Sequence, residues 1–162
     1  MPFITNDIEL AAVLNEIVDK IMPIVQKNIS EELHENILKW VYYEDYFPNK
    51  YYYNKTGIPT WQFLNSFLWK DNPISTLGSS KILYYAWETL SFDPLTALHG
   101  SERGGDAREN LAEILDVEGY DKGIFGGKLR GAFWKNTMDD LLSGTIESWF
   151  KTQFANYGVI KT

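Results

Sequence analysis

The sequence predicts an α+β fold, with a long kinked N-terminal helix, a C-terminal helix, a strand between them and Gly-rich loops. Three observations support this. Apolar residues recur with helical spacing over residues 10–41 and again over residues 134–157. Between these segments, residues 81–87 alternate as a strand does. The 162 residues show no repeat and no shift in composition, so we expect a single domain, residues 1–162.

The first helix should begin after Asn6, because Asn6 and Glu9 have the spacing of a capping box. The apolar stripe behind them keeps one phase for about ten turns. Pro23 lies inside this stripe, and proline removes a backbone donor and clashes with the preceding turn. We therefore predict one long helix that is kinked at Pro23.

The middle of the chain contains turns and one clear strand. Residues 54–60 and 71–73 have turn composition, and the apolar residues 61–69 between them suggest a short helix. The strand at 81–87 carries apolar side chains on both faces, so we expect both faces to be covered.

A second helix should follow Asp106, which with Glu109 again forms a capping-box pattern, and should end at Gly119. The glycine-containing segments on either side of it are typical of Gly-rich loops: residues 99–105 suggest a loop, and residues 120–131 a long exposed loop or a hairpin.

The last helix keeps a single apolar phase from Trp134 to Tyr157, and Gly158 should terminate it. Gly144 lies inside this pattern and costs about 1 kcal/mol relative to alanine. We predict one uninterrupted C-terminal helix.

The composition excludes several classes of protein. The net charge of −7 and pI of about 4.8 argue against a protein that binds nucleic acid by neutralising phosphates, although such a surface would let DNA slide past. The absence of cysteine excludes disulfides, thiolate metal sites and thiol nucleophiles. No apolar run approaches the roughly 20 residues of a membrane helix, and we see no secretory signal. We expect function in a reducing cytoplasm or in a particle assembled there.

The most unusual segment follows the first helix. Seven of the twelve residues from Tyr42 to Tyr53 are aromatic. Some of these rings should cover the end of the first helix and the core. In an extended chain, however, the side chains of three consecutive tyrosines point alternately to opposite sides, so not all can be buried. Tyrosine suits half-buried contacts between proteins. The nearby charges form no basic groove for stacked single-stranded nucleic acid, so protein contact is the preferred interpretation.

Catalytic and ligand-binding signals are weak. His99 precedes Gly100-Ser101, but no G-x-S-x-G elbow surrounds them, and a serine and histidine so close in sequence do not easily point at each other. Gly104-Gly105 lacks the Walker lysine of a phosphate loop, so a helix cap is the better interpretation. His34 is read as a surface residue, and the abundant carboxylates cannot be paired from sequence. We expect no catalytic residue, cofactor or metal.

Positive residues in the loops offer contacts to a neighbouring acidic subunit, as at Lys128 and Arg130. The protein-interface candidates are Tyr42, Tyr46, Tyr51, Tyr52, Tyr53, His99, Arg103, Lys128 and Arg130.

Three segments, in order, carry a family resemblance: VYYEDYFPNKYYYNKTG, ALHGSERGGDARENLAEIL and IFGGKLRGAFWKNTMDDLL. Together they resemble the small neck and tail-completion proteins, or head–tail joining proteins, of tailed bacteriophages, over roughly residues 24–158. The matching positions are Val41, Tyr42, Tyr46, Pro48 and Tyr51, then Lys55-Thr56-Gly57, His99-Gly100 and Phe133-Trp134. Lysine replaces the arginine of the family's R-T-G turn, and the proline of its P-F pair is absent.

The resemblance implies an α+β fold in which the long kinked N-terminal helix and the C-terminal helix are packed on a small antiparallel sheet. It also implies a virion structural protein without enzymatic activity or cofactor. Copies would form a ring of the neck between the capsid portal and the tail. Its partners would be further copies, portal or adaptor proteins, and tail proteins. DNA would be only a passing strand in the channel, and no membrane would be involved. Assembly would take place in the host cytoplasm.

Two other functions remain open. A phage-encoded acidic inhibitor would bind a host nucleic-acid-binding protein by imitating the charge of DNA, with Glu31-Glu32 and Glu35 as the densest cluster. A small hydrolase would use the loop at His99.

Overall fold

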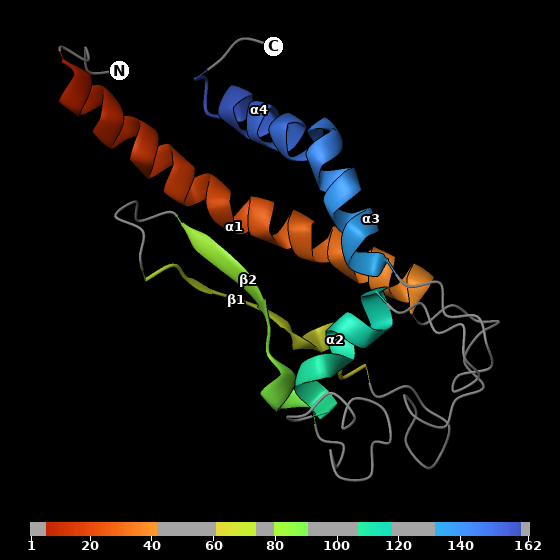
Figure 1. Cartoon of the computed structure of the whole chain (residues 1–162). Helices are drawn as coiled ribbons and strands as arrows, with labels where there is room; N and C mark the ends of the chain where they lie inside the picture. The colour runs from red at the N-terminus through yellow and green to blue at the C-terminus, as the bar shows by residue number, and fades with distance from the viewer. Residues whose placement is uncertain (1–5, 42–60, 74–79, 91–106, 118–131, 160–162) are drawn as a thin grey trace.

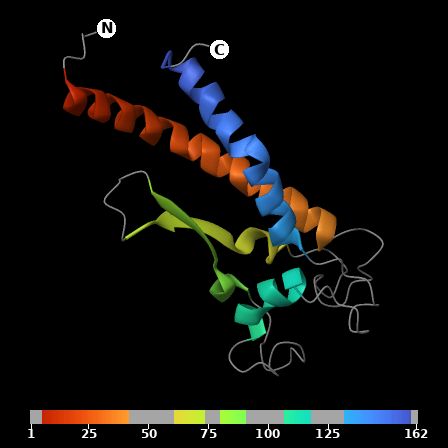
Figure 2. The ribbon, with the colours of Figure 1, turned by 45° about the horizontal axis from the view of Figure 1, so that its top comes forward.

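The computed structural model describes residues 6–41, 61–73, 80–90, 107–117 and 132–159 (Figure 1). Its elements are α1 (Asp7–Trp40), β1 (Phe67–Asp71), β2 (Lys81–Tyr85), α2 (Ala107–Val117), α3 (Phe133–Asp140) and α4 (Ile146–Asn156). These residues are mostly helical and include a two-stranded antiparallel sheet, consistent with an α+β fold. Both views show the hairpin on one side of α1 and α3–α4 on another, with α2 near the C-terminal end of α1 (Figures 1 and 2).

Helix α1 begins as the sequence predicts. The side-chain oxygen of Asn6 accepts a hydrogen bond from the backbone N–H of Glu9 at 2.9 Å, which satisfies one of the unpaired donors of the first turn. The helix is continuous for 34 residues and includes Pro23. One long helix is therefore confirmed, whereas the predicted kink at Pro23 is not.

The sheet is a hairpin in which Phe67 lies opposite Tyr85 and Asp71 lies opposite Lys81. An ion pair between Lys81 and Asp71 joins the strands at the far end. The predicted strand is confirmed over residues 81–85, but it ends before Trp87, which begins a 3₁₀ turn. All five residues of β2 are half-buried, so full coverage of both faces is not observed.

The helix predicted over residues 61–69 is largely wrong. A single 3₁₀ turn, Leu64–Ser66, leads directly into β1. Ser66 explains the change. Its hydroxyl donates to the carbonyl of Phe63 at 2.6 Å, while its own carbonyl accepts the N–H of Ala86 at 2.6 Å. The first hydrogen bond closes the turn. The second pairs the residue just before β1 with the residue just after β2, so the chain continues as a strand.

The core lies around the C-terminal half of α1 and is rich in rings. Its fully or nearly fully buried members come from α1, the 3₁₀ turn, β1, α2 and α3, and are Leu33, Ile37, Val41, Phe63, Phe67, Leu115 and Phe133. The ring of Phe63 meets Phe67 at 5.5 Å and Phe133 at 5.7 Å, both edge-to-face. Such geometry adds to the hydrophobic gain of burial.

The C-terminal helix is broken, and here the sequence prediction is wrong. A π-helical turn, Leu141–Thr145, separates α3 from α4, and within it Gly144 has φ +105°. A side chain would be strained there, which glycine avoids. The predicted stop at Gly158 is confirmed. Its φ is +72°, and the bonds from Val159 N–H to Phe154 and from Gly158 N–H to Ala155 complete a Schellman motif.

Helix α2 appears where the sequence predicts it, although its predicted cap at Asp106 and stop at Gly119 lie outside the described residues. Asp116 joins α2 to α3. Its carbonyl accepts the N–H of Ala132 at 2.5 Å, and its carboxylate accepts the N–H of Trp134 at 2.7 Å. A carboxylate at the first turn of α3 is favoured by the helix dipole.

Candidate subunit interface and aromatic cavity

The nine interface candidates named from the sequence all lie outside the described residues: Tyr42, Tyr46, Tyr51, Tyr52, Tyr53, His99, Arg103, Lys128 and Arg130. They remain predictions. His34 lies within α1 and is half-buried. The described residues contain no group of three or more histidines and carboxylates that could hold a metal ion.

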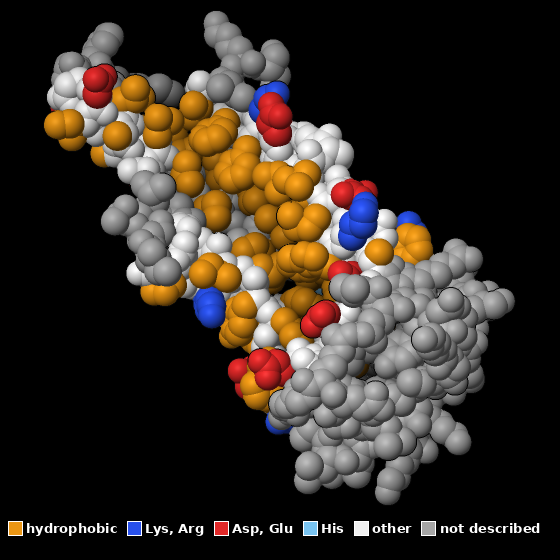
Figure 3. Space-filling model, viewed as in Figure 1, with side chains coloured by type: hydrophobic (Ala, Val, Ile, Leu, Met, Phe, Trp, Pro, Cys, Tyr) orange, Lys and Arg blue, Asp and Glu red, His pale blue; other side chains and the backbone are white. Residues whose placement is uncertain are grey.

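The structure places an apolar surface where the sequence analysis expected a packed helix. In α1, Ile21 and Val25 are buried, but Ile8, Leu10 and Val13 remain 82%, 42% and 39% exposed. None of the residues of α4 is buried. Figure 3 shows apolar side chains gathered in a continuous stretch along α1 and toward α4. We call this the α1–α4 surface; its exposed large members are Leu10, Val13 and Ile24 on α1, with Tyr157 and Val159 after α4.

The N-terminal half of α1 has the spacing of a coiled-coil seam. Leu10, Leu14, Ile17, Ile21 and Ile24 follow one another at intervals of four, three, four and three residues. This is a heptad pattern, of the kind that another helix can pack against. Ile21 is already fully buried within the chain, so the positions open to another helix are Leu10, Leu14, Ile17 and Ile24. The sequence identifies these residues as part of the apolar stripe of the first helix. Periodicity identifies the face of a helix, but it does not say what covers that face.

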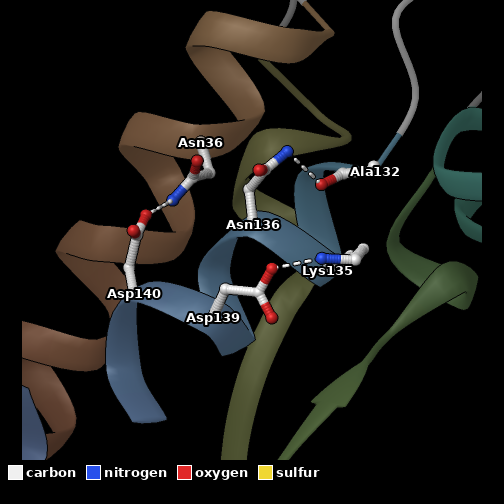
Figure 4. A network of polar contacts seen from close by, with 6 residues as sticks. All are labelled: Asn36, Ala132, Lys135, Asn136, Asp139 and Asp140. Atoms are coloured by element: carbon white, nitrogen blue, oxygen red, sulfur yellow. Dashed lines mark hydrogen bonds and ion pairs between the residues drawn. The ribbon is translucent and has the colours of Figure 1, made fainter. Parts of the chain in front are cut away.

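A partly buried polar cluster joins α1 to α3 (Figure 4). Asn36 is 4% exposed, and its amide nitrogen lies 3.3 Å from both the Glu32 and the Asp140 carboxylates. Its amide oxygen accepts the indole N–H of Trp40 at 3.1 Å. Both ends of the amide are thus used, which is what a buried polar group requires.

The two carboxylates of this cluster lie close enough to affect each other. Burial, followed by the negative charges of Asp140 and Glu35, raises the pKa of Glu32 above its ordinary value of 4.5. A hydrogen bond with Asp140 acts in the same direction, and the contact with Asn36 opposes it. This geometry serves to join two helices, and Figure 4 shows Asp139 directed to Lys135 instead.

A pH dependence follows for Glu32. Because its pKa is higher in the folded state, the folded protein binds more protons than the unfolded chain above pH 4.5. As pH rises from 4.5 through the higher pKa of the folded state, ionisation of Glu32 therefore lowers the free energy of unfolding. Glu32→Gln should raise the urea midpoint at pH 7 relative to the wild type, and by less at pH 4.

Glu31→Gln is the matched control, because Glu31 is exposed and pairs with Lys27 at 3.6 Å on the outer side of the same helix. It should change the urea midpoint little at either pH. If Glu32→Gln lowered the midpoint equally at both pH values, the contact with Asn36 would outweigh the repulsion.

A cavity of about 360 Å³ lies between β2, α2 and α3. Phe67, Phe133 and Tyr85 contribute aromatic carbon to its walls. Glu113 and Asp116, one turn apart on α2, bring two carboxylates to its lining, along with the partly exposed ring of Trp134. The sequence pattern does not predict this cavity, because its lining comes from four separate elements, β1, β2, α2 and α3.

Among the described helices, none is long and apolar enough to cross a membrane. Comparison of the chain with models of protein families, with curated proteins and with solved structures found no match in any of the three.

Proposed function

We propose that this protein is a non-enzymatic structural subunit of a bacteriophage neck, which joins the head to the tail as a member of a ring. The observation that carries the proposal is the uncovered α1–α4 surface. Contiguous apolar surface of this kind favours a protein partner. The resemblance of the sequence to head–tail joining proteins is the reason that we place this partner in the neck of a phage particle.

The occupant of the α1–α4 surface is a further copy of the chain. The heptad spacing of α1 accepts a helix, and α1 and α4 are themselves apolar helices that need a cover. A ring requires one patch to meet a different patch on the next copy. The tyrosine-rich segment 42–53 is our candidate for a second patch.

The charges on these helices favour apolar rather than electrostatic association. Glu16 pairs with Lys20 at 2.5 Å on α1, and Glu147 pairs with Lys151 at 2.6 Å on α4. Exposed pairs of this kind contribute little to stability, but they neutralise each other locally. The net charge of −7 also suits a neck whose channel lets DNA pass without binding it.

Charges placed on the α1–α4 surface test the proposal. Leu10→Lys with Val13→Lys should weaken self-association at least about tenfold, because each side chain contributes about 1.5–3 kcal/mol when fully buried by a partner. Both residues are exposed in the single chain, so the thermal midpoint should stay the same. Analytical ultracentrifugation and thermal melts measure the two effects separately.

Asn15→Lys is the control, since Asn15 is exposed and lies on the opposite side of α1 from Val13. It adds the same kind of charge and should leave assembly unchanged. A wild-type chain that stayed monomeric at its highest soluble concentration, or a double variant that assembled normally, would contradict the proposal.

The acidic-inhibitor alternative receives less support from the structure. A DNA mimic should display ionised carboxylates along one face. In the densest acidic cluster, Glu31 pairs with Lys27, and the pKa of Glu32 is raised by burial beside Asp140. The hydrolase alternative depends on His99, which lies outside the described residues. Loss of an ester- or glycoside-cleaving activity in His99→Ala would favour it.

A further inference from the structure

The polar cluster between α1 and α3 lies where the chain bends from α3 into α4 (Figures 1 and 4). Asp140 is the last residue of α3, and the π-helical turn that separates α3 from α4 begins at Leu141. We propose that Glu32, Asn36 and Asp140 form a proton-dependent joint, which sets the direction of α4 along α1 when the two carboxylates share a proton. Its effect on assembly rests on the proposed ring, because α1 and α4 carry the α1–α4 surface.

The hydrogen bonds of Asn36 show that the joint is short of a donor. The amide nitrogen of asparagine carries two hydrogens. Three oxygens approach it here: the carbonyl of Glu32 at 3.2 Å, and the carboxylates of Glu32 and Asp140 at 3.3 Å each. The amide keeps this orientation, because its oxygen accepts the indole N–H of Trp40. When both carboxylates are ionised, two negative groups therefore share one neutral donor.

A proton taken up from water supplies the missing donor. A protonated Glu32 carboxyl donates its O–H to the Asp140 carboxylate, which links α1 to α3 directly and leaves one negative charge in place of two. The surroundings favour this state. Burial, followed by the negative charges of Asp140 and Glu35, raises the pKa of Glu32, and the hydrogen bond with Asp140 acts in the same direction.

The charged groups that act on Glu32 are negative: Glu35 on α1 and Asp140 on α3. The neighbouring lysines of α1, α3 and α4 are engaged with other groups; the contacts are Lys27–Glu31, Lys39 over the Trp40 ring, Lys135–Asp139 and Lys151–Glu147. His34 is two residues along α1 from Glu32, and side chains with that spacing do not face each other. A proton is therefore the cation that relieves the repulsion.

The joint acts at the end of α3 that controls α4. Phe133 holds the first turn of α3 in the ring cluster, and the buried side chain of Leu141 and the joint hold its last turn. Beyond the bend, none of the residues of α4 is buried, so its own contacts hold it only weakly. Repulsion between two ionised carboxylates loosens the last turn of α3, and α4 then moves away from α1.

The direction of α4 matters for assembly, because the α1–α4 surface is made by two helices. A partner can match this surface only while the helices keep one arrangement, and a preorganised surface loses less freedom on binding. Copies of the chain should therefore associate more tightly below the pKa of Glu32 in the folded state, which lies above 4.5, than above it.

Spin-label distances test the joint in the single chain. The labels replace Asn15 on α1 and Glu147 on α4, both exposed, in the Leu10→Lys/Val13→Lys background, so that assembly does not contribute. The distance distribution should be narrow at pH 4, and longer and broader at pH 7. An unchanged distribution between these two pH values would overturn the proposal.

Variants of the two carboxylates assign the pH response. Glu32→Gln donates an amide hydrogen to Asp140 at every pH, so its distances should be narrow at pH 7 as well as at pH 4. Asp140→Asn should also abolish the response, and NMR of the Glu32 carboxyl carbon should show its pKa moving toward 4.5. Glu31→Gln removes an exposed charge one residue away and should preserve the wild-type response. All other carboxylates still titrate in Glu32→Gln, so a pH response that persisted there would overturn the joint.

Analytical ultracentrifugation at pH 7 then connects the joint to assembly. Without the lysines on α1, Glu32→Gln should self-associate roughly twofold to tenfold more tightly than the wild type, the range expected for one hydrogen bond, and Glu31→Gln should not. A chain with pH-dependent distances that never assembles keeps the joint and loses the ring. A chain that assembles with distances independent of pH keeps the ring and loses the joint.

Discussion

Phe133→Ala should lower the free energy of unfolding by about 3–5 kcal/mol, the range found when a buried phenylalanine is truncated. Phe133 is 1% exposed and meets the rings of Phe63 and Phe67 edge-to-face, at 5.7 and 6.0 Å. It also begins α3, so its ring connects that helix to α1, β1 and α2. Its loss would open a void beside the existing cavity, which the rigid neighbours cannot fill. Urea unfolding measures the change.

Trp134→Ala is the control for this truncation. Trp134 follows Phe133 directly and is larger, but it is 39% exposed. Its removal should cost much less, on the order of 1 kcal/mol. If both variants lost the same free energy, burial in the ring cluster would not be what makes Phe133 important.

Gly144→Ala should destabilise the protein by about 1–3 kcal/mol, the cost of holding a residue in a sparsely populated backbone region. At φ +105° an added Cβ finds open space, so the penalty comes from backbone strain and not from a collision. The chain can relieve the strain by forming a regular helix through residues 141–145. Helix α4 would then change its direction relative to α1.

Two measurements distinguish a variant that keeps the bend under backbone strain from one that forms a regular helix through residues 141–145. Urea unfolding gives the lost stability, and distances between spin labels at Asn15 on α1 and Glu147 on α4, both exposed, report the direction of α4. Ser143→Ala is the control, because Ser143 is exposed in the same turn and its hydroxyl donates locally to the Asp140 carbonyl and lies 3.5 Å from the Thr145 hydroxyl. A Gly144→Ala variant with wild-type stability and unchanged label distances would show that the bend does not depend on glycine.

The sequence predicts the elements whose signals are local. Asn6 caps the first helix and Gly158 terminates the last, because each residue acts on the turn beside it. The strand at 81–85 and the helix at 107–117 are also found from their own patterns. The predicted kink at Pro23 is not confirmed by the continuous helix.

The secondary-structure predictions are wrong where contacts between residues far apart in the sequence determine the local structure. Phe67–Asp71 becomes a strand because it pairs with β2, and the segment itself has no alternation that reveals this. The break at Gly144 is hidden because the apolar phase continues across it. Glycine inside a helix costs only about 1 kcal/mol relative to alanine, so the sequence alone does not predict a break there. The packing of α3 on α1 favours the bent arrangement over a straight helix.

The candidate sites were less predictable than the fold. The residues of the α1 seam were found from their spacing, but their exposure depends on how far α3, α4 and the hairpin reach along α1. The cavity required Glu113, Phe133 and Tyr85 to be brought together from three elements. The tyrosine-rich segment and the basic loop residues lie outside the described residues and remain predictions.

The uneven burial of α1 would affect how quickly copies of the chain exchange in the ring that we propose. Its first four turns carry few tertiary contacts, and a helical stretch of that length is marginal alone in water. Their backbone amides should therefore exchange with deuterium sooner than those around Leu33 and Ile37. Docking must first hold these fraying turns in place, which reduces the net affinity. Early contacts between subunits would then be short-lived, and misplaced copies could leave before the ring closes.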